Sequence, residues 1–453
     1  MNNQFGLPKN LGNGLLLRWA TPADTEELAE FNVRIHSDNP EKPETWLARW
    51  TEDLMRGDHP TTSASDFTIV IDKDADDKIV SSMNLISQVW LYEGVPIGVG
   101  RPELVGTDSA YRRRGLVREQ FDAVHAKSAA RGELVQAITG IPWYYRQFGY
   151  GMALDLGGGR DFLWDRPGND QTVDKETYQI RPAKVTDWPI LQTLYEAHNK
   201  GSLLSRARDE AGWRYELTIP HPTSMYAKQF YLVETAPSAS LSTGVPNPQP
   251  VAYVEYKQFG KSYFVRELGV LPGHSWRAVG LFLTRHFKKI ADELYEKEEK
   301  RLRGVFFGLG QGHPIYEALG RQLEEQRRPY AWYIRVPDLP AFLRHIAPVL
   351  EKRLAHSVLA GYSGTCRVNL YKQQFTLVFE DDQLTEVGTY KAKVVDDGDI
   401  QFPGTTLLQL IFGQASLDEL NAIHPDCYSR QAEPAILFNI LFPKRPSWVV
   451  GFG

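Results

Sequence analysis

The stretch AYRRRGLVREQF (Ala110–Phe121) places three consecutive arginines and a glycine directly before a segment with regularly spaced apolar residues. From Leu116 onward the apolar residues recur at helical spacing, and Gly132 is typical of the end of a helix. The preceding PELVGT (Pro102–Thr107) has the composition of a short buried strand. This region is therefore predicted to form a strand, a tight loop of arginine and glycine, and a helix.

Three adjacent arginines repel one another, so this loop needs a neighbouring negative charge or full solvation. The first N–H groups of a helix lack partners within the helix and attract anions. Gly115 lets the backbone approach a ligand closely, and the guanidinium groups offer planar donors that suit phosphate oxygens. The pattern favours a loop that binds a pyrophosphate, while a solvated basic turn is the alternative that spacing alone leaves open.

The overall composition restricts the class of protein. The chain has 453 residues, enough for about three domains. Its net charge of −5 provides no basic field for nucleic acid, and its two cysteines exclude a disulfide framework or a thiolate zinc site. The N-terminus lacks a signal-peptide core, and no apolar run reaches the ~18 residues of a membrane span. We expect a cytoplasmic protein with no membrane span, metal or nucleic-acid partner.

Two parts of the chain repeat one plan. The segment LRWATPADTEEL, from Leu17, aligns with IRPAKVTDWPIL, from Ile180, so that arginine, alanine, aspartate and leucine recur at matching positions. Further along, GIPWYYRQFG (Gly140–Gly149) has a counterpart in GHPIYEALG (Gly312–Gly320). Segments with the composition of strands occupy the same order in both parts. The chain is therefore predicted to contain two tandem copies of one α/β fold.

The two copies differ at the arginine loop. The second copy keeps Arg277 and Gly280, but Ala278 and Val279 stand where the first copy has its second and third arginines. We expect the first copy to bind a cofactor that contains the pyrophosphate and the second copy to be structural. The remnant of the loop leaves open whether the second copy also binds it.

A third part begins at about Leu339. It contains LPAFLRHIAPVLEKRL, with helical spacing, the strand-like TCRVNLY and FTLVFED, and the helix-like TTLLQLIFGQ. The apolar PAILFNILFP (Pro434–Pro443) is predicted to form a final strand. The apolar interior of this part is either a packed core, which is favoured, or a cavity for a lipid.

Four segments together resemble the enhanced-intracellular-survival (Eis) family of acetyltransferases, and the resemblance covers nearly the whole chain. They are YRRRGLVR (Tyr111–Arg118), YRQFGYG (Tyr145–Gly151), YIRVPDLPAFL (Tyr333–Leu343) and FGQASLDEL (Phe412–Leu420). The resemblance implies an α/β (α+β) chain with two tandem Gcn5-related N-acetyltransferase (GNAT) folds, at residues 1–175 and 176–336. A sterol-carrier-protein-like (SCP2-like) domain at residues 337–453 would follow, and the family assembles as hexamers.

The resemblance also implies acetyl-CoA as cosubstrate and assigns residues to it. The superfamily loop motif falls on Arg112 to Val117, although Val117 stands where a small residue is usual. The residues expected to bind the cofactor are those of the strand, Leu104, Val105, Gly106 and Thr107, and those of the loop, Arg112, Arg113, Arg114, Gly115, Leu116 and Val117. The strand would pair with the pantetheine arm, and the loop would hold the pyrophosphate.

The same resemblance assigns the proton transfers. Tyr150 matches the tyrosine that protonates the departing thiolate, and a phenol with a pKa near 10 can serve as such an acid. The C-terminal carboxylate, here that of Gly453, would take the proton of the amine. Glu103, acting through a water molecule, is the alternative base. His36 is interpreted as an ordinary surface or core histidine.

The expected activity is transfer of an acetyl group to a primary amine, with aminoglycosides, polyamines and lysine-type amines as candidate substrates. Acidic and aromatic residues in Glu30–Trp50 would line a pocket for a polycationic amine or form a solvated pair of helices. A lipid or sterol carrier that uses the third domain, with the GNAT folds as a scaffold, is the main alternative. An assembly protein that binds CoA without turnover is a further alternative.

Overall fold

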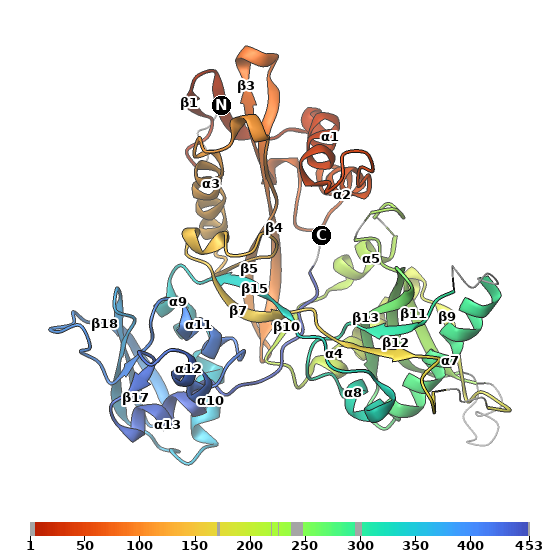
Figure 1. Cartoon of the computed structure of the whole chain (residues 1–453). Helices are drawn as coiled ribbons and strands as arrows, with labels where there is room; N and C mark the ends of the chain where they lie inside the picture. Colours follow the sequence, from red (N-terminus) through yellow and green to blue (C-terminus); the bar gives the residue numbers. More distant parts are fainter. Residues whose placement is uncertain are drawn as a thin grey trace.

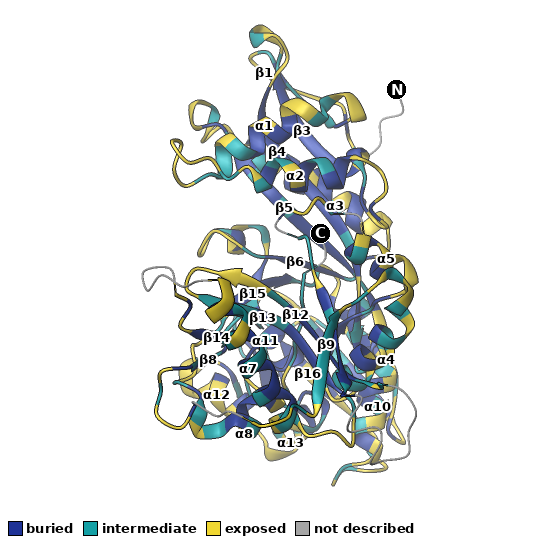
Figure 2. Ribbon diagram, turned by 90° about the vertical axis from the view of Figure 1, so that its right-hand side faces the viewer, coloured by how far each residue is buried: buried dark blue, intermediate teal, exposed yellow. Residues whose placement is uncertain are grey.

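The computed structural model describes residues 5–169, 173–218, 220–224, 226–236, 248–294 and 301–451, which fold around three β-sheets. Figure 1 shows three units, each built on one of these sheets. In Figure 2 the buried residues follow the sheets, while the outer helices and loops carry the exposed residues. Among the described helices, none combines the length and hydrophobicity that a membrane span requires.

The first unit is a mixed sheet with helices on both faces (Figure 1). Its strands, in spatial order, are β1 (Lys9–Gly12), β2 (Leu15–Trp19), β3 (Phe67–Asp72), β4 (Lys78–Tyr92), β5 (Val95–Thr107), β6 (Val135–Ile138), β15 (Tyr330–Arg335) and β7 (Gly151–Leu156), and β10 (Leu204–Arg206) pairs with β4. Helices α1 (Thr25–His36) and α2 (Trp46–Met55) cover one face, and α3 (Leu116–Ala130) covers the other. The predicted strand, loop and helix around the arginines are confirmed.

The alternation of side chains along β3 explains the two faces. Ile69 and Ile71 pack with residues of α1 and α2, whereas Val70 points to the opposite face and packs with Leu116 of α3. Successive residues of a strand face opposite sides, so the consecutive apolar residues Ile69, Val70 and Ile71 must be covered on both sides. This apolar run explains why the unit has three layers.

The second unit repeats this plan. Its strands, in spatial order, are β8 (Arg160–Leu163), β14 (Gly304–Phe307), β13 (Ser262–Val270), β12 (Pro250–Phe259), β11 (Phe230–Thr235) and β9 (Tyr178–Pro182), and its helices are α4 (Trp188–Asn199), α5 (Glu210–Thr218), α7 (Trp276–Leu294) and α8 (Pro314–Leu319). An ion pair of 2.7 Å joins Arg18 to Asp24 in the first unit, and a pair of the same length joins Arg181 to Asp187 in the second. The fold is consistent with tandem GNAT-like units.

The two units exchange one strand each. Strand β8 lies in residues 1–175 by sequence but pairs with β14 of the second sheet. Strand β15 lies in residues 176–336 but inserts between β6 and β7 of the first sheet. Pairing of this kind ties the two units together through backbone hydrogen bonds.

The third unit has a five-stranded sheet covered by short helices. Its strands, in spatial order, are β18 (Gln383–Thr389), β17 (Gln374–Glu380), β16 (Gly364–Asn369), β19 (Ile400–Gln401) and β20 (Tyr428–Ser429), and its helices are α9 (Leu339–His345), α10 (Ala347–Ala355), α11 (Thr406–Ile411), α12 (Leu417–Ile423) and α13 (Ala432–Leu441). The strand predicted at Pro434–Pro443 is wrong, because α13 covers most of it. Pro434 lies in the first turn, where a helix tolerates proline, and Leu437 and Leu441 are buried four residues apart.

Candidate active site

The site lies where two parallel strands of the first unit separate. Strands β5 and β6 pair only at Val99–Val135 and Gly100–Gln136, after which β5 continues to Thr107 without a partner on that side. A bulge interrupts the pairing of β5 with β4 on its other side, and Leu104 at this bulge has a φ of 51°. A left-handed backbone at leucine costs about 1–2 kcal/mol, and such strain is concentrated at functional sites.

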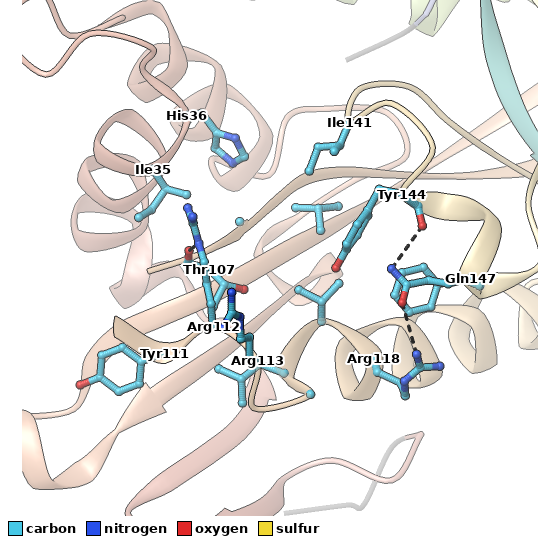
Figure 3. A pocket seen from close by; sticks show the side chains of 16 residues that line it. Ile35, His36, Thr107, Tyr111, Arg112, Arg113, Arg118, Ile141, Tyr144 and Gln147 are labelled. Atoms are coloured by element: carbon cyan, nitrogen blue, oxygen red, sulfur yellow. Dashed lines mark hydrogen bonds between the residues drawn. The ribbon is translucent and has the colours of Figure 1, made fainter. Parts of the chain in front are cut away.

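A cleft of about 710 Å³ opens beside the free part of β5. Of the ten residues predicted to bind a cofactor, eight line it, namely Val105, Gly106, Thr107, Arg112, Arg113, Gly115, Leu116 and Val117. Figure 3 shows Arg112 and Arg113 on one side of this cleft and Tyr144 and Gln147 on the other. We refer to it as the first pocket.

The arginine loop places uncompensated positive charge at the start of α3. Gly115, the N-cap residue, has a φ of 79° and offers no side chain to the first N–H groups of the helix. Arg112 donates to the carbonyl oxygen of Thr107 at 3.4 Å, and Arg114 donates to that of Ala110 at 3.2 Å. Within the described chain, no carboxylate forms an ion pair with any arginine of the triplet. These donors suit a polyanion.

Arg114 is the predicted loop residue that lies aside from the first pocket. Its guanidinium group stacks over the ring of Tyr111, 4.8 Å from the centroid. Tyr111 in turn donates a hydrogen bond of 2.7 Å to Asp72 of β3. Arg114 therefore contacts the loop itself, while Arg112 and Arg113 face the cleft.

A second pocket of about 270 Å³ continues from the first along β5. It is lined by aromatic side chains, Trp46, Trp50, Tyr145 and Tyr226, and by the charged side chains of Arg101 and Glu103. The two pockets share His36, Val105 and Ile141, so they meet at the bulge of β5. Leu104, the remaining predicted cofactor residue, lines the second pocket.

Arg101 and Glu103 form a buried ion pair in the second pocket. Arg101 also donates a hydrogen bond of 2.5 Å to the hydroxyl group of Tyr226, a residue of the second unit. Burial raises the pKa of the Glu103 carboxyl group, and the neighbouring guanidinium group offsets part of this effect. A Cβ atom built on Gly451 would lie only 2.8 Å from Nη1 of Arg101, so the C-terminal segment reaches this ion pair.

The structure places two tyrosines of the YRQFGYG segment differently. Tyr150 is buried beside α3, and its hydroxyl oxygen lies 2.8 Å from Nε2 of His125. Tyr145 instead lines the second pocket, with its hydroxyl oxygen 3.5 Å from the position that a Cβ of Gly140 would occupy. Burial raises the pKa of both phenols. Sequence reasoning selected Tyr150, although Tyr145 belongs to the same segment.

Sequence reasoning also gave no functional role to His36. Its side chain lines both pockets, and its Nε2 lies 3.0 Å from the position that a Cβ of Gly106 would occupy (Figure 3). Burial lowers its pKa, which keeps the ring neutral near pH 7. The predicted base, the carboxylate of Gly453, lies outside the described residues.

Comparison with known proteins agrees with this geometry. Residues 18–153 match the family model described as Acetyltransferase (GNAT) domain. The first unit is a GNAT acetyltransferase domain. GNAT domains use acetyl-CoA, and the cationic first pocket fits such a donor. The chain therefore contains an acyltransferase domain. No curated protein matches the sequence significantly.

Solved structures share the fold of nearly the whole chain, GNAT domain included. A GCN5-related N-acetyltransferase from Anabaena variabilis has a TM-score of 0.63 at 13% identity, with 97% of this chain and 100% of that chain covered. A probable N-acyltransferase from Enterococcus faecalis has a TM-score of 0.67 at 12% identity, with the same coverage. Eis1 from Mycobacterium abscessus has a TM-score of 0.57 at 15% identity, with 95% and 98% covered.

Proposed function

We propose that this protein is an acetyl-CoA-dependent N-acetyltransferase that acts on primary amines. The observation that carries the proposal is the meeting of two unlike pockets at the β5 bulge. One pocket is lined at a helix N-terminus by Arg112 and Arg113, which form no ion pair within the described chain, and the other by aromatic rings and the ion pair of Arg101 and Glu103. An anionic donor and a cationic acceptor would therefore approach each other at Leu104 and Val105.

The donor site is proposed to consist of the free part of β5 and the arginine loop. Leu104–Thr107 offers backbone N–H and C=O groups that lack a partner strand on one side. Arg112 and Arg113, with the N–H groups that follow Gly115, offer charge-assisted hydrogen bonds to phosphate oxygens. Bound acetyl-CoA would supply the activated acetyl group, and the residues of the chain would orient it.

The acceptor is proposed to be an amine on a cationic or polyamine-like body. The rings of Trp50 and Tyr226 lie with their centroids 4.6 Å apart at the wall of the second pocket. Aromatic faces attract cations by about 0.5–2 kcal/mol each. The Glu103 carboxylate offers oxygen atoms that can accept a hydrogen bond from the amine, although Arg101 compensates its charge. Aminoglycosides, polyamines and lysine-type amines all fit this description.

Amine attack requires a base, and we propose the carboxylate of Gly453, with Glu103 as the alternative. The position of Gly451 beside Arg101 supports the carboxylate of Gly453 as the base, because a guanidinium group attracts a nearby carboxylate. The raised pKa of Glu103 favours its acceptance of a proton, but the ion pair with Arg101 opposes it. The amine proton would pass to whichever carboxylate lies within reach.

The departing thiolate requires an acid, and two tyrosines are candidates. Tyr150 remains the prediction from the sequence motif. Tyr145 is supported as the acid by its place on the wall of the second pocket, whereas the Tyr150 hydroxyl group forms a hydrogen bond with His125. A group that donates a proton in the reaction must lie within hydrogen-bond reach of the acceptor atom.

The proposal is tested by measuring CoA release from acetyl-CoA with a panel of polyamines, aminoglycosides and amino-acid amines. We expect turnover with at least one polycationic amine, and a fall of at least about 100-fold when the catalytic base is removed. A chain without Phe452 and Gly453 moves the terminal carboxylate to Gly451 and tests its position. A chain with an amidated C-terminus tests its charge, and Glu103→Gln tests the alternative. Binding of acetyl-CoA without turnover by any amine would contradict the proposal.

The lipid-carrier alternative has less support. The apolar side chains of the third unit form one buried cluster that includes Phe375, Leu410 and Phe438. The pocket described on this unit is lined in part by Lys372, Gln373 and Asp426. These polar groups do not suit an apolar chain.

A further inference from the structure

The second unit contains the same strand separation as the GNAT domain, but the space there is filled. Strand β13 pairs in parallel with β14 from Ser262 to Val265 and then continues to Val270 without a partner on that side. The remaining cavity has a volume of about 10 Å³, against about 710 and 270 Å³ for the two pockets of the first unit. We refer to this region as the second cleft.

One part of the filling is His313, the N-cap residue of α8, which bonds to the part of β13 that lies beyond its pairing with β14. Its Nε2 donates to the carbonyl oxygen of Leu268 at 3.1 Å, while its Nδ1 accepts from the backbone N–H of Ile315 at 3.3 Å. Burial lowers the pKa of His313, so the neutral ring can make both bonds. At the matching place of the first unit, Ile141 is 50% exposed on the wall of the pockets, whereas His313 is 6% exposed.

The loop of the second unit has also lost its anion site. Ser275 accepts a hydrogen bond of 3.2 Å from the backbone N–H of Ala278, which satisfies one of the first N–H groups of α7. Arg277, the remnant of the arginine triplet, donates to the carbonyl oxygen of Ala318 at 2.8 Å. Arg112 and Arg114 of the first unit also donate to backbone carbonyl oxygens, but Gly115 offers the first N–H groups of α3 no side-chain acceptor.

The other part of the filling is the C-terminal segment of the chain, which runs between the units in blue in Figure 1. Pro446 accepts from the backbone N–H of Leu203 at 3.1 Å, and the Ser447 hydroxyl group accepts from that of Leu204 at 3.2 Å. The Trp448 ring lies against Gly310, where a Cβ would approach it to 2.9 Å. Trp448 and Val450 both line the residual cavity.

We propose that the second cleft is the docking site of the chain's own C-terminal segment, Pro446–Val450, and that Trp448 is a positioning residue for the acetyl transfer. Docking there holds Gly451 beside Arg101 in the second pocket. The unit that resembles a cofactor-binding fold thus binds a peptide segment in place of a cofactor. This inference rests on the proposed function for its effect on turnover, but not for the docking itself.

Two consequences follow for the intact protein. Each chain binds one molecule of acetyl-CoA, because the second cleft is occupied and its loop donors are used. Turnover depends on Trp448, although this residue lies outside both pockets of the first unit. The contact depends on packing, since the buried Nε1 of Trp448 has no hydrogen-bond partner in the described part of the chain.

The test uses the full-length chain and the variants Trp448→Ala and Trp448→Phe. Trp164→Ala is the matched control, because this buried tryptophan of the same unit bonds to Thr284 of α7 and does not line the second cleft. Three properties are measured for each protein. They are the stoichiometry and Kd of CoA by calorimetry, the amide hydrogen exchange of residues 445–451, and the kcat and KM with the best amine.

We expect one CoA per chain in all four proteins, with Kd values within about twofold of one another. Trp448→Ala should exchange faster in residues 445–451 and lose on the order of 10–100-fold in kcat, as expected for a misplaced reacting group. Trp448→Phe should keep most of the slow exchange and most of the kcat of the unmodified chain, and Trp164→Ala should change neither the exchange nor kcat.

Several results would overturn the proposal. Binding of two CoA molecules to the unmodified chain would show that the second cleft is a cofactor site. Unchanged exchange in Trp448→Ala would show that the cleft does not hold the segment, and faster exchange with unchanged kcat would exclude a positioning role. Should no amine support turnover, the proposed function fails, while stoichiometry and exchange still decide the docking.

Discussion

The Tyr226 hydroxyl group accepts a hydrogen bond of 2.5 Å from Arg101, and this bond joins the second unit to the central strand of the GNAT domain. The Arg101 guanidinium group also lies over the Tyr226 ring, 5.5 Å from its centroid. The pocket proposed for the acceptor is therefore built by both units. The shape of this pocket depends on Tyr226, which lies outside the GNAT domain.

Replacing Tyr226 should weaken acceptor binding without affecting the donor. We expect Tyr226→Ala to raise KM for a polycationic amine about 5–30-fold, because one aromatic face for the cation is lost. KM for acetyl-CoA should stay within about twofold. Steady-state kinetics with each substrate varied in turn measures both values. Tyr226→Phe keeps the ring, so an equal rise in this variant would show that the hydroxyl group, not the aromatic face, is responsible.

The arginine loop gives a second prediction. Arg113→Ala should raise the Kd of CoA about 10–100-fold, because charge-assisted hydrogen bonds contribute about 1.5–3 kcal/mol each. Arg114→Ala should have a smaller effect, since the Arg114 side chain stacks on Tyr111 beside the first pocket. Calorimetry with CoA at low and high salt provides the measurement. A larger loss from Arg114→Ala than from Arg113→Ala would contradict this assignment of the loop.

Much of the fold could be predicted from the sequence, because its local signals agreed with the final packing. The repeated arginine and aspartate at the start of each copy form equal ion pairs, and the arginine loop lies between a strand and a helix as expected. The prediction of a strand at Pro434–Pro443 is wrong, since a short, mostly apolar run has no periodicity that separates a buried strand from a helix.

The site could be predicted only where neighbours in sequence are neighbours in space. The loop Arg112–Val117 meets this condition, and nearly all of it lines the first pocket. Tyr226 and Gly451 reach Arg101 from other units, and the exchange of β8 and β15 likewise joins segments far apart in the sequence. Pairings of this kind leave no local pattern to detect.

The two tyrosines can be separated by a matched pair of variants. We expect Tyr145→Phe to lower kcat about 100-fold or more with little change in either KM, because Tyr145, unlike Tyr150, lines the second pocket. Tyr150→Phe removes the hydrogen bond to His125 and should cost about 1 kcal/mol of stability, with kcat reduced less than about threefold. Loss of turnover in Tyr150→Phe alone would restore the acid predicted from the sequence motif.

His125 makes the stability of the GNAT domain depend on pH. Burial lowers the pKa of His125 to about 3, and the charge of Arg335 acts in the same direction. In the unfolded chain a histidine takes up a proton below about pH 6.5, so the unfolded state binds more protons than the folded state between these values. The free energy of unfolding therefore falls as the pH drops, by about 2 kcal/mol from this residue at pH 5.

Urea unfolding at pH 7 and pH 5, followed by tryptophan fluorescence, measures this contribution. His125→Gln should be less stable at both pH values because the bond to Tyr150 changes, but its loss of stability between pH 7 and pH 5 should be about 2 kcal/mol smaller than that of the unmodified chain. His356→Gln, at an exposed histidine of the third unit, is the control and should leave the pH dependence unchanged. Equal pH dependence in His125→Gln and the unmodified chain would show that His125 takes up its proton in the folded protein.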